Sequence, residues 1–251
     1  MREQYFPLIE GRETAGEINF VIVCEHASNV IPSAFADLGL DAAALRSHIA
    51  WDPGALGVAR ELRRVFSADL VAGSVSRLLY DCNRPPDAPS AMPDKSEIFD
   101  IPGNQSLSEA ARAARTRAIY EPFRAALAAI LDERQNGIMV TVHSFTPVYF
   151  GVQRMSEVGI LHDEDTRLAD AMLMRRPRDF PYRLERNVPY SARDGVTHTL
   201  RAHAIERGWP NVMLEIRNDL IETPEQQAVM AGHLAGLLSS ALPHLKEPGH
   251  V

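Results

Sequence analysis

Three short apolar runs stand out in the pattern of hydrophobic and polar positions, and each opens onto residues that can carry chemistry. They are 20–24, followed by Glu25 and His26; 137–142, followed by His143 and Ser144; and 211–214, followed by Glu215, Ile216 and Arg217. Short β-branched runs of this kind are typical of buried strands in a parallel sheet. Ligand sites of open α/β sheets lie beyond the carboxyl ends of the strands. The pattern therefore predicts two histidines and a carboxylate at one edge of the sheet, as in a metal-dependent hydrolase.

Helical periodicity alternates with these runs along the chain. Helices are expected from Asp52 to Phe66, over 106–134 with Pro122 kinking or splitting it, and over 164–175, 197–208 and 223–242; further strands are expected at 70–75, 78–80, 158–161 and 183–187. The stretch 81–105 lacks periodicity and is expected to be a long functional loop. Strand and helix alternation predicts a three-layer α/β/α sandwich with a mostly parallel central sheet, as one domain over 1–251.

Composition narrows the class of protein. The formal charge is −7, from 26 basic and 33 acidic residues, with no basic block, which argues against a nucleic-acid partner. No apolar run approaches the roughly 20 residues that span a bilayer, so no membrane partner is expected. Residues 1–12 lack a signal-peptide pattern, and Cys24 and Cys82 are expected to stay reduced. We expect a cytoplasmic enzyme with a small-molecule substrate, whose oligomeric state the sequence leaves open.

His26 and His143 are the candidate metal ligands. Imidazole is the commonest zinc ligand, and catalytic zinc takes three protein ligands and keeps one position open. Asp52 is a possible third ligand, although Asp-Pro-Gly is equally a good helix start. Glu25 and Asn29 are alternates. A second pair with ligand spacing, His203 and Glu206, is predicted to lie on one face of a peripheral helix and not to bind metal.

Glu215 is the candidate general base, because a carboxylate beside an activated water can take its proton and pass it to the leaving amine. The alternative is a structural salt bridge to Arg217, two residues along the same face. Arg77 can polarise a carbonyl oxygen. Arg84 has a planar fork that can bind a carboxylate bidentately, with Asn83 adding an amide donor. The alternative interpretation of the segment that holds Asn83 and Arg84 is a simple turn.

Other catalytic patterns are missing from the sequence. It contains no Gly-x-Ser-x-Gly elbow, no phosphate-binding loop, no Gly-x-Gly-x-x-Gly and no His-Glu-x-x-His. Serine hydrolases and nucleotide-binding enzymes therefore lack support.

The motifs together resemble those of the N-formylglutamate amidohydrolases. They are Cys24-Glu25-His26-Ala27-Ser28-Asn29, Trp51-Asp52-Pro53-Gly54-Ala55, Ser76-Arg77, Asp81-Cys82-Asn83-Arg84-Pro85, His143-Ser144-Phe145 and Glu215-Ile216-Arg217-Asn218-Asp219-Leu220. That family is similar to the zinc carboxypeptidases and aspartoacylases, so the resemblance implies a phosphorylase/hydrolase-like sandwich. Singly the motifs are weak, but they extend over about residues 20 to 221.

The resemblance also implies roles for these residues. His26 and His143 match the metal-binding histidines of those relatives, and Glu215 matches their base. Asp52 is our favoured third ligand for one zinc ion, and we expect Arg77 to stabilise the oxyanion. Asn83 and Arg84 would hold a substrate carboxylate, and Ser144 and Arg217 would add further substrate contacts. The expected reaction is hydrolysis of a small N-acyl amino acid, most simply N-formylglutamate. The alternatives are a zinc peptidase or cell-wall amidase, and a metal-free ligand-binding module.

Overall fold

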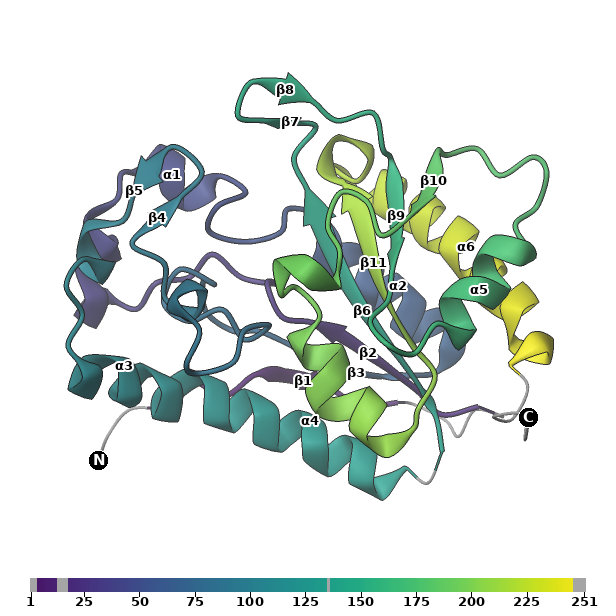
Figure 1. Ribbon diagram of the computed structural model, residues 1–251, viewed down its shortest axis with the longest axis horizontal. Helices are drawn as coiled ribbons and strands as arrows, with labels where there is room; N and C mark the ends of the chain where they lie inside the picture. The colour runs from purple at the N-terminus through teal and green to yellow at the C-terminus, as the bar shows by residue number, and fades with distance from the viewer. Residues whose placement is uncertain (1–3, 13–17, 135, 246–251) are drawn as a thin grey trace.

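A seven-stranded sheet forms the centre of the computed structural model, which describes residues 4–12, 18–134 and 136–245 (Figure 1). In spatial order the strands are β1 (Leu8–Glu10), β3 (Asp69–Ala72), β2 (Phe20–Cys24), β6 (Ile138–Phe145), β11 (Asn211–Arg217), β9 (Val158–Leu161) and β10 (Leu184–Arg186). β3, β2, β6 and β11 run parallel, β1 and β9 pair antiparallel with β3 and β11, and β10 runs parallel to β9. The predicted, mostly parallel sheet is confirmed.

Three helices cover one face of the sheet. They are α2 (Ala55–Phe66), α5 (Arg167–Met174) and α6 (Pro224–Ala241), which lie behind the sheet and to its right in Figure 1. Ile22 of β2 and Leu214 of β11 share one buried cluster with Val58 of α2 and Leu234 of α6. The predicted start of α6 is confirmed, because Thr223 forms a capping box with Gln226 that satisfies the first free N–H groups of the helix.

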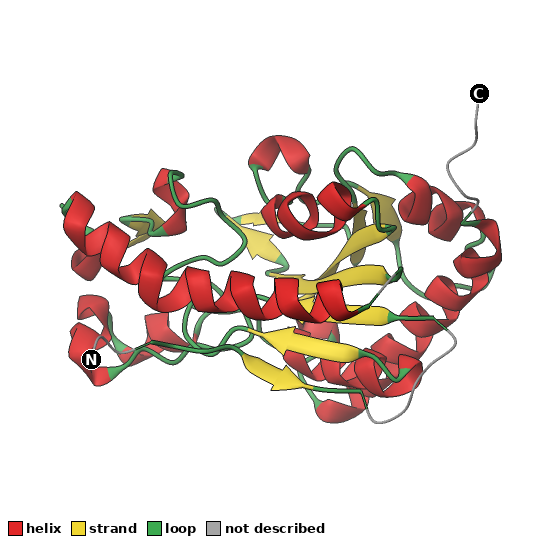
Figure 2. Cartoon of the chain, turned by 90° about the horizontal axis from the view of Figure 1, so that it is seen from below, coloured by secondary structure: helices red, strands yellow, loops and turns green. Residues whose placement is uncertain are grey.

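The opposite face carries α4 (Glu121–Glu133) and the turns at Leu200–Ala204, so the sandwich has three layers (Figure 2). The helix α3 (Glu109–Arg115) precedes α4. The expected break near Pro122 takes the form of a π-helical turn at Thr116–Tyr120, which joins α3 to α4. Proline lacks an N–H and its ring crowds the carbonyl four residues earlier. A wider, π-helical turn just before Pro122 relieves that conflict, and the chain stays helical from α3 into α4.

A lobe beside the sheet is built from two separate segments, 33–50 and 81–115 (left in Figure 1). It contains α1 (Ala42–Arg46) and the hairpin of β4 (Lys95–Ser96) and β5 (Phe99–Asp100). The stretch 81–105 is therefore less irregular than predicted. It also includes 3₁₀ turns at Pro89–Ala91 and Pro102–Asn104.

Two sequence predictions near the site are wrong. Residues 78–80 form no strand; they are buried in turns, and their apolar character reflects packing in the second core rather than pairing. The helix predicted to begin at Asp52 begins at Ala55, because Gly54 adopts a φ of +81° and the Asp52 side chain caps nothing. Gly54 is required there, since a Cβ would lie 2.3 Å from the carbonyl oxygen of Ile221.

Cys24 and Cys82 are both buried free thiols. Within the described ranges, every helix is too short or too polar to cross a bilayer. Residues 1–3, which belong to the N-terminal stretch predicted to lack a signal peptide, and residues 246–251 lie outside the described residues.

Candidate active site

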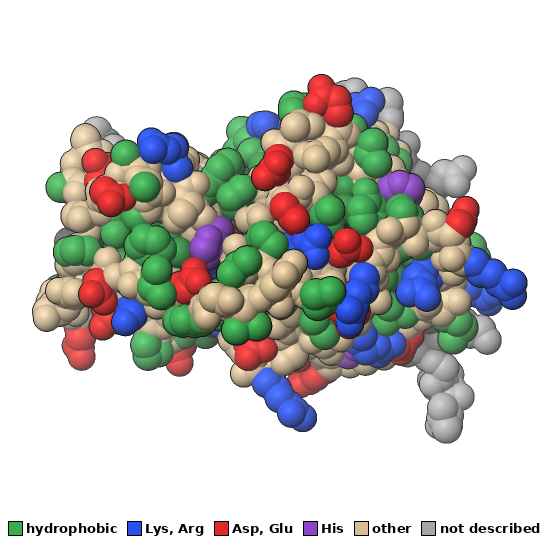
Figure 3. All heavy atoms as spheres, turned by 90° about the horizontal axis from the view of Figure 1, so that it is seen from above, with side chains coloured by type: hydrophobic (Ala, Val, Ile, Leu, Met, Phe, Trp, Pro, Cys, Tyr) green, Lys and Arg blue, Asp and Glu red, His purple; other side chains and the backbone are tan. Residues whose placement is uncertain are grey.

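A polar cavity of about 670 Å³ opens at the carboxyl ends of β2, β6 and β11. The lobe supplies one wall, and the hairpin of β7 (Val148–Tyr149) and β8 (Val152–Gln153), with residues 189–196, supplies the other. Seen from above, the surface is notched between the lobe and the main body (Figure 3).

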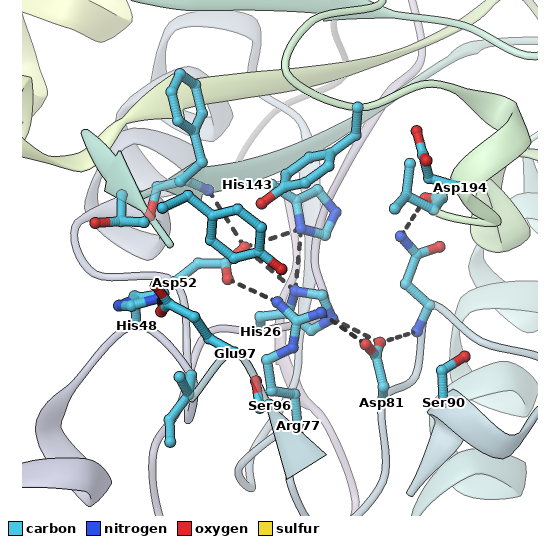
Figure 4. Close-up of a pocket in the computed structure, with 18 of the residues that line it drawn as sticks. His26, His48, Asp52, Arg77, Asp81, Ser90, Ser96, Glu97, His143 and Asp194 are labelled. Carbon is cyan, nitrogen blue, oxygen red and sulfur yellow. Dashed lines mark hydrogen bonds and ion pairs between the residues drawn. The ribbon is translucent and has the colours of Figure 1, made fainter. Parts of the chain in front are cut away.

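His26, Asp52 and His143 converge at the cavity floor, where their side chains point toward one another (Figure 4). Nδ1 of His26 lies 3.2 Å from Nδ1 of His143. Oδ2 of Asp52 lies 3.2 Å from the former nitrogen and 2.9 Å from the latter. The three residues come from the turn after β2, the loop before α2 and the end of β6, and all are buried. The structure thus brings both predicted histidines together with the favoured third residue.

Each of the two imidazoles turns its other nitrogen toward a buried carboxylate. Oδ1 of Asp81 lies 2.7 Å from Nε2 of His26, and Oε2 of Glu25 lies 3.1 Å from Nε2 of His143. Burial alone would lower the pKa of His143, but the charges of Glu25 and Asp52 reverse this and raise it well above its usual value. Carboxylates in this outer position fix the ring orientation and make the inner nitrogen a more basic ligand.

This donor set fits a single divalent metal ion. Two imidazole nitrogens and one carboxylate oxygen lie within 3.2 Å of one another. A tetrahedral ion with bonds of about 2.0–2.1 Å holds neighbouring ligands about 3.3 Å apart. Two histidines plus one carboxylate, with a fourth direction facing the cavity, is also the ligand pattern of catalytic zinc.

Replacing Asp81 by asparagine is expected to weaken metal binding without removing a ligand. The change takes away the negative charge that faces Nε2 of His26, so the affinity for Zn²⁺ should fall about 10–100-fold. Competition with a chromophoric chelator measures this. Asp170→Asn is the matched control, because Asp170 lies on α5 and pairs with Arg186. Equal Zn²⁺ affinities in the two variants would contradict the outer role of Asp81.

Glu215 is a buried carboxylate beside the histidine cluster. It lies opposite His143 in the register of β11 and β6, and its Oε2 makes no hydrogen bond. Burial raises the pKa of Glu215 to about 7, against the opposing effect of His143. The expected alternative partner, Arg217, instead pairs with Asp219 at 2.8 Å and Glu157 at 3.6 Å. Glu215 is therefore suited to exchanging a proton near neutral pH.

Arg77 joins two carboxylates of the cavity floor. Its Nη1 donates to Oδ1 of Asp52 at 3.2 Å, and its Nη2 donates to Oδ2 of Asp81 at 2.8 Å. Although burial opposes it, the charges of these two residues raise the pKa of Arg77, so the guanidinium stays charged. The same side chain lines the cavity, where a substrate oxygen can reach it.

Asn83 and Arg84 also line the cavity, but the two side chains are engaged differently. Asn83 ties its turn to the 196–199 segment, because Oδ1 accepts from the backbone N–H of Thr199 at 2.9 Å and Nδ2 donates to the carbonyl of Val196 at 2.5 Å. Nη1 of Arg84 donates to the carbonyl of Asp194 at 2.6 Å. This hydrogen bond holds the guanidinium of Arg84 in a fixed orientation on the wall of the cavity.

The remaining predicted residues lie in different surroundings. Ser144 lines the cavity and donates its hydroxyl to the carbonyl of Pro53 at 2.8 Å. Glu25 faces the outer nitrogen of His143, and the amide of Asn29 donates to the carbonyl of Leu45. The structure brings neither of these alternates into the ligand cluster, and Arg217 does not line the cavity.

Several residues of the cavity have no role that their sequence pattern predicts. The sequence predicts no role for the Asp81 side chain, which faces His26. Arg154 and Tyr190 line the wall from irregular segments. Tyr190 lies near Glu215, and burial raises its pKa. No periodicity or motif marks these two positions, since loops place their side chains only through tertiary packing.

The sandwich and the cluster at its strand ends place the chain in the class of α/β proteins that bind their ligands at the carboxyl ends of the strands. Comparison with family models makes this class more specific. The chain belongs to the N-formylglutamate amidohydrolase family, whose model matches residues 18–222. Among functionally curated proteins, none matches the chain.

Solved structures agree with this placement. The gene product Atu2144 from Agrobacterium tumefaciens is 52% identical, with a TM-score of 0.93 and 98% of each chain covered. The N-formylglutamate amidohydrolase from Ralstonia eutropha JMP134 is 20% identical, with a TM-score of 0.63 over 96% of this chain and 98% of that one, and shows the shared fold. The chain is thus an amidohydrolase by family, and its fold is that of a known member.

Proposed function

We propose that this amidohydrolase is zinc-dependent and hydrolyses small N-acyl amino acids, with N-formylglutamate as the preferred substrate. The observation that carries the proposal is the buried cluster of His26, Asp52 and His143 beside Glu215, whose Oε2 makes no hydrogen bond. Membership of the N-formylglutamate amidohydrolase family supports the substrate. The cytoplasmic location and the single-domain organisation stay predictions from the sequence.

In the proposed reaction, the substrate amide lies over the cavity floor and its carboxylate faces Arg84. When bound by the two histidines and Asp52, a zinc ion supplies Lewis-acid chemistry. Glu215 takes a proton from the attacking water at Oε2 and then gives it to the leaving nitrogen. Arg77 stabilises the charge that develops on the carbonyl oxygen, and its ion pairs hold its guanidinium in place.

Formate release from purified, zinc-loaded protein tests the proposal. The panel should contain formylated and acetylated amino acids, dipeptides and muropeptides. We expect formylated amino acids to be the best substrates. Cleavage of dipeptides or muropeptides alone would favour the peptidase or cell-wall amidase. A protein that neither holds nor binds zinc, and hydrolyses nothing in the panel, would be a ligand-binding module.

The pH dependence of the reaction should report the ionisation of Glu215. A general base must be deprotonated, and burial raises the pKa of Glu215 to about 7. The rate constant kcat/KM should therefore rise with pH and level off above its pKa. A bound cation lowers the pKa of a nearby carboxylate, so the half-maximum is expected at or below pH 7. The profile is measured between pH 5 and 9 with the metal site saturated, and the slow reaction of Glu215→Gln should lack this limb. An identical limb in that variant would contradict the assignment.

A further inference from the structure

Arg154 places a guanidinium with an unused donor on the wall of the cavity. It follows β8, and its Nη1 is buried without a hydrogen-bond partner. Among the residues that the structure describes, no carboxylate forms an ion pair with it. A buried charged donor without an acceptor is costly. Its position on a cavity wall suggests that a ligand supplies the acceptor.

Three aromatic rings fix the guanidinium of Arg154. Its Cζ lies 4.4 Å from the ring centre of Tyr149, 5.0 Å from that of Tyr190 and 5.5 Å from that of Phe145. These contacts orient the planar fork and keep part of it from water. Tyr190 also shares a side-chain hydrogen bond with the guanidinium, and Nη1 stays available for a ligand. Arg154 is therefore held ready to bind an anionic group.

Three other cations of the cavity already have partners within the protein, whereas Lys95 is an exposed residue of β4. Arg77 pairs with Asp52 and Asp81, and His48 pairs with Glu97 at 2.9 Å. Arg84 donates to the carbonyl of Asp194 and lies 4.0 Å from a carboxylate oxygen of Asp81. Arg154 differs from these three, because its guanidinium packs against aromatic side chains and, among the described residues, forms no ion pair.

Arg84 and Arg154 lie on two walls of the cavity that are built from different elements of the fold. Arg84 lies in the turn after β3, on the side of the lobe, whereas Arg154 follows the β7–β8 hairpin. Tyr190, which contacts Arg154, lines the same cavity as Glu215. A ligand whose amide reaches Glu215 thus lies beside two separate guanidinium groups.

Resting on the proposed reaction, we propose that Arg154 is the residue that determines side-chain specificity. It binds a carboxylate at the end of the substrate side chain, while Arg84 binds the carboxylate next to the amide nitrogen. The enzyme then selects acidic over neutral side chains of equal size. Hydrogen bonds between two charged groups are strong enough to make this selection about 10–100-fold.

Two pairs of nearly isosteric compounds test this role. The first pair is N-formylglutamate and N-formylglutamine, compared by kcat/KM. The second pair is glutarate and its monoamide, compared by calorimetric binding to the zinc-loaded protein. We expect the unmodified enzyme to prefer the dianion in both pairs. In Arg154→Met the preference should fall about 10–100-fold, while kcat/KM for N-formylglutamine stays within a few-fold. Arg178→Met, an exposed arginine that does not line the cavity, is the matched control.

The outcomes separate the role of Arg154 from the proposed reaction. An equal loss for both members of each pair in Arg154→Met would mean that Arg154 only supports the hairpin, and would overturn the inference. Glutarate binding that depends on Arg154, in a protein that hydrolyses neither formylated compound, would uphold the anion site and overturn the reaction. Arg154→Lys keeps the charge and should recover part of the preference, which a purely packing role does not predict.

Discussion

Glu215→Gln should lower kcat by about 10²–10⁴-fold, the usual contribution of general acid–base catalysis. Glutamine keeps the size of the side chain and removes its ability to take a proton. Because Glu215 lies outside the ligand cluster, the zinc content of the variant should be unchanged. Steady-state kinetics with N-formylglutamate and elemental analysis measure the two quantities.

Glu185→Gln is the control for this substitution, since Glu185 lies on β10 and pairs with the exposed Arg183. It should keep full activity. If Glu215→Gln lost zinc, Glu215 would be a ligand rather than the base. If it kept nearly normal turnover, the buried carboxylate would have only a structural role.

His143→Ala should lose zinc and activity together. The substitution removes one of the three clustered donor atoms and leaves Glu25 facing an empty space. The affinity for Zn²⁺ should fall by more than the roughly 10–100-fold that is typical for loss of an outer partner. Metal titration and formate release are measured on the same preparation, after circular dichroism has shown that the variant is folded.

His203→Gln provides the matched control for a buried histidine. Burial lowers the pKa of His203 to about 4, and the residue lies in a π-helical turn outside the cluster. Its predicted lack of a metal role therefore becomes testable. Zinc retained in His143→Ala and lost in His203→Gln would reverse the assignment of the ligands.

The strand ends were predictable because buried strands have a simple sequence pattern. Residues 20–24, 138–142 and 211–214 are nearly continuous apolar or β-branched runs, and His26, His143 and Glu215, which follow them, line the cavity. The strand register then determines which of these residues are neighbours, since β11 and β6 pair Glu215 with His143. These properties follow from local sequence and from the parallel arrangement.

Contacts made by loops could not be predicted in the same way. Asp52 was compatible with a helix cap or a ligand, and only packing shows that α2 starts three residues later. Residues 78–80 look like a strand because burial in a turn selects the same apolar side chains. The orientation of the Arg217 side chain depends on its ion pairs with Asp219 and Glu157. The alternation of side chains along a strand does not reveal those partners.

The two hairpins around the cavity meet through one residue of the lobe. Glu97, between β4 and β5, accepts from the backbone N–H of Phe150, between β7 and β8, and pairs with His48. Neither hairpin belongs to the central sheet, whereas His143 and Glu215 lie on its strands and His26 follows one directly. Changes in hairpin length or in the side chains at their tips therefore leave the sheet intact. In evolutionary terms, the range of substrates can diverge within this fold while the hydrolytic chemistry is inherited unchanged.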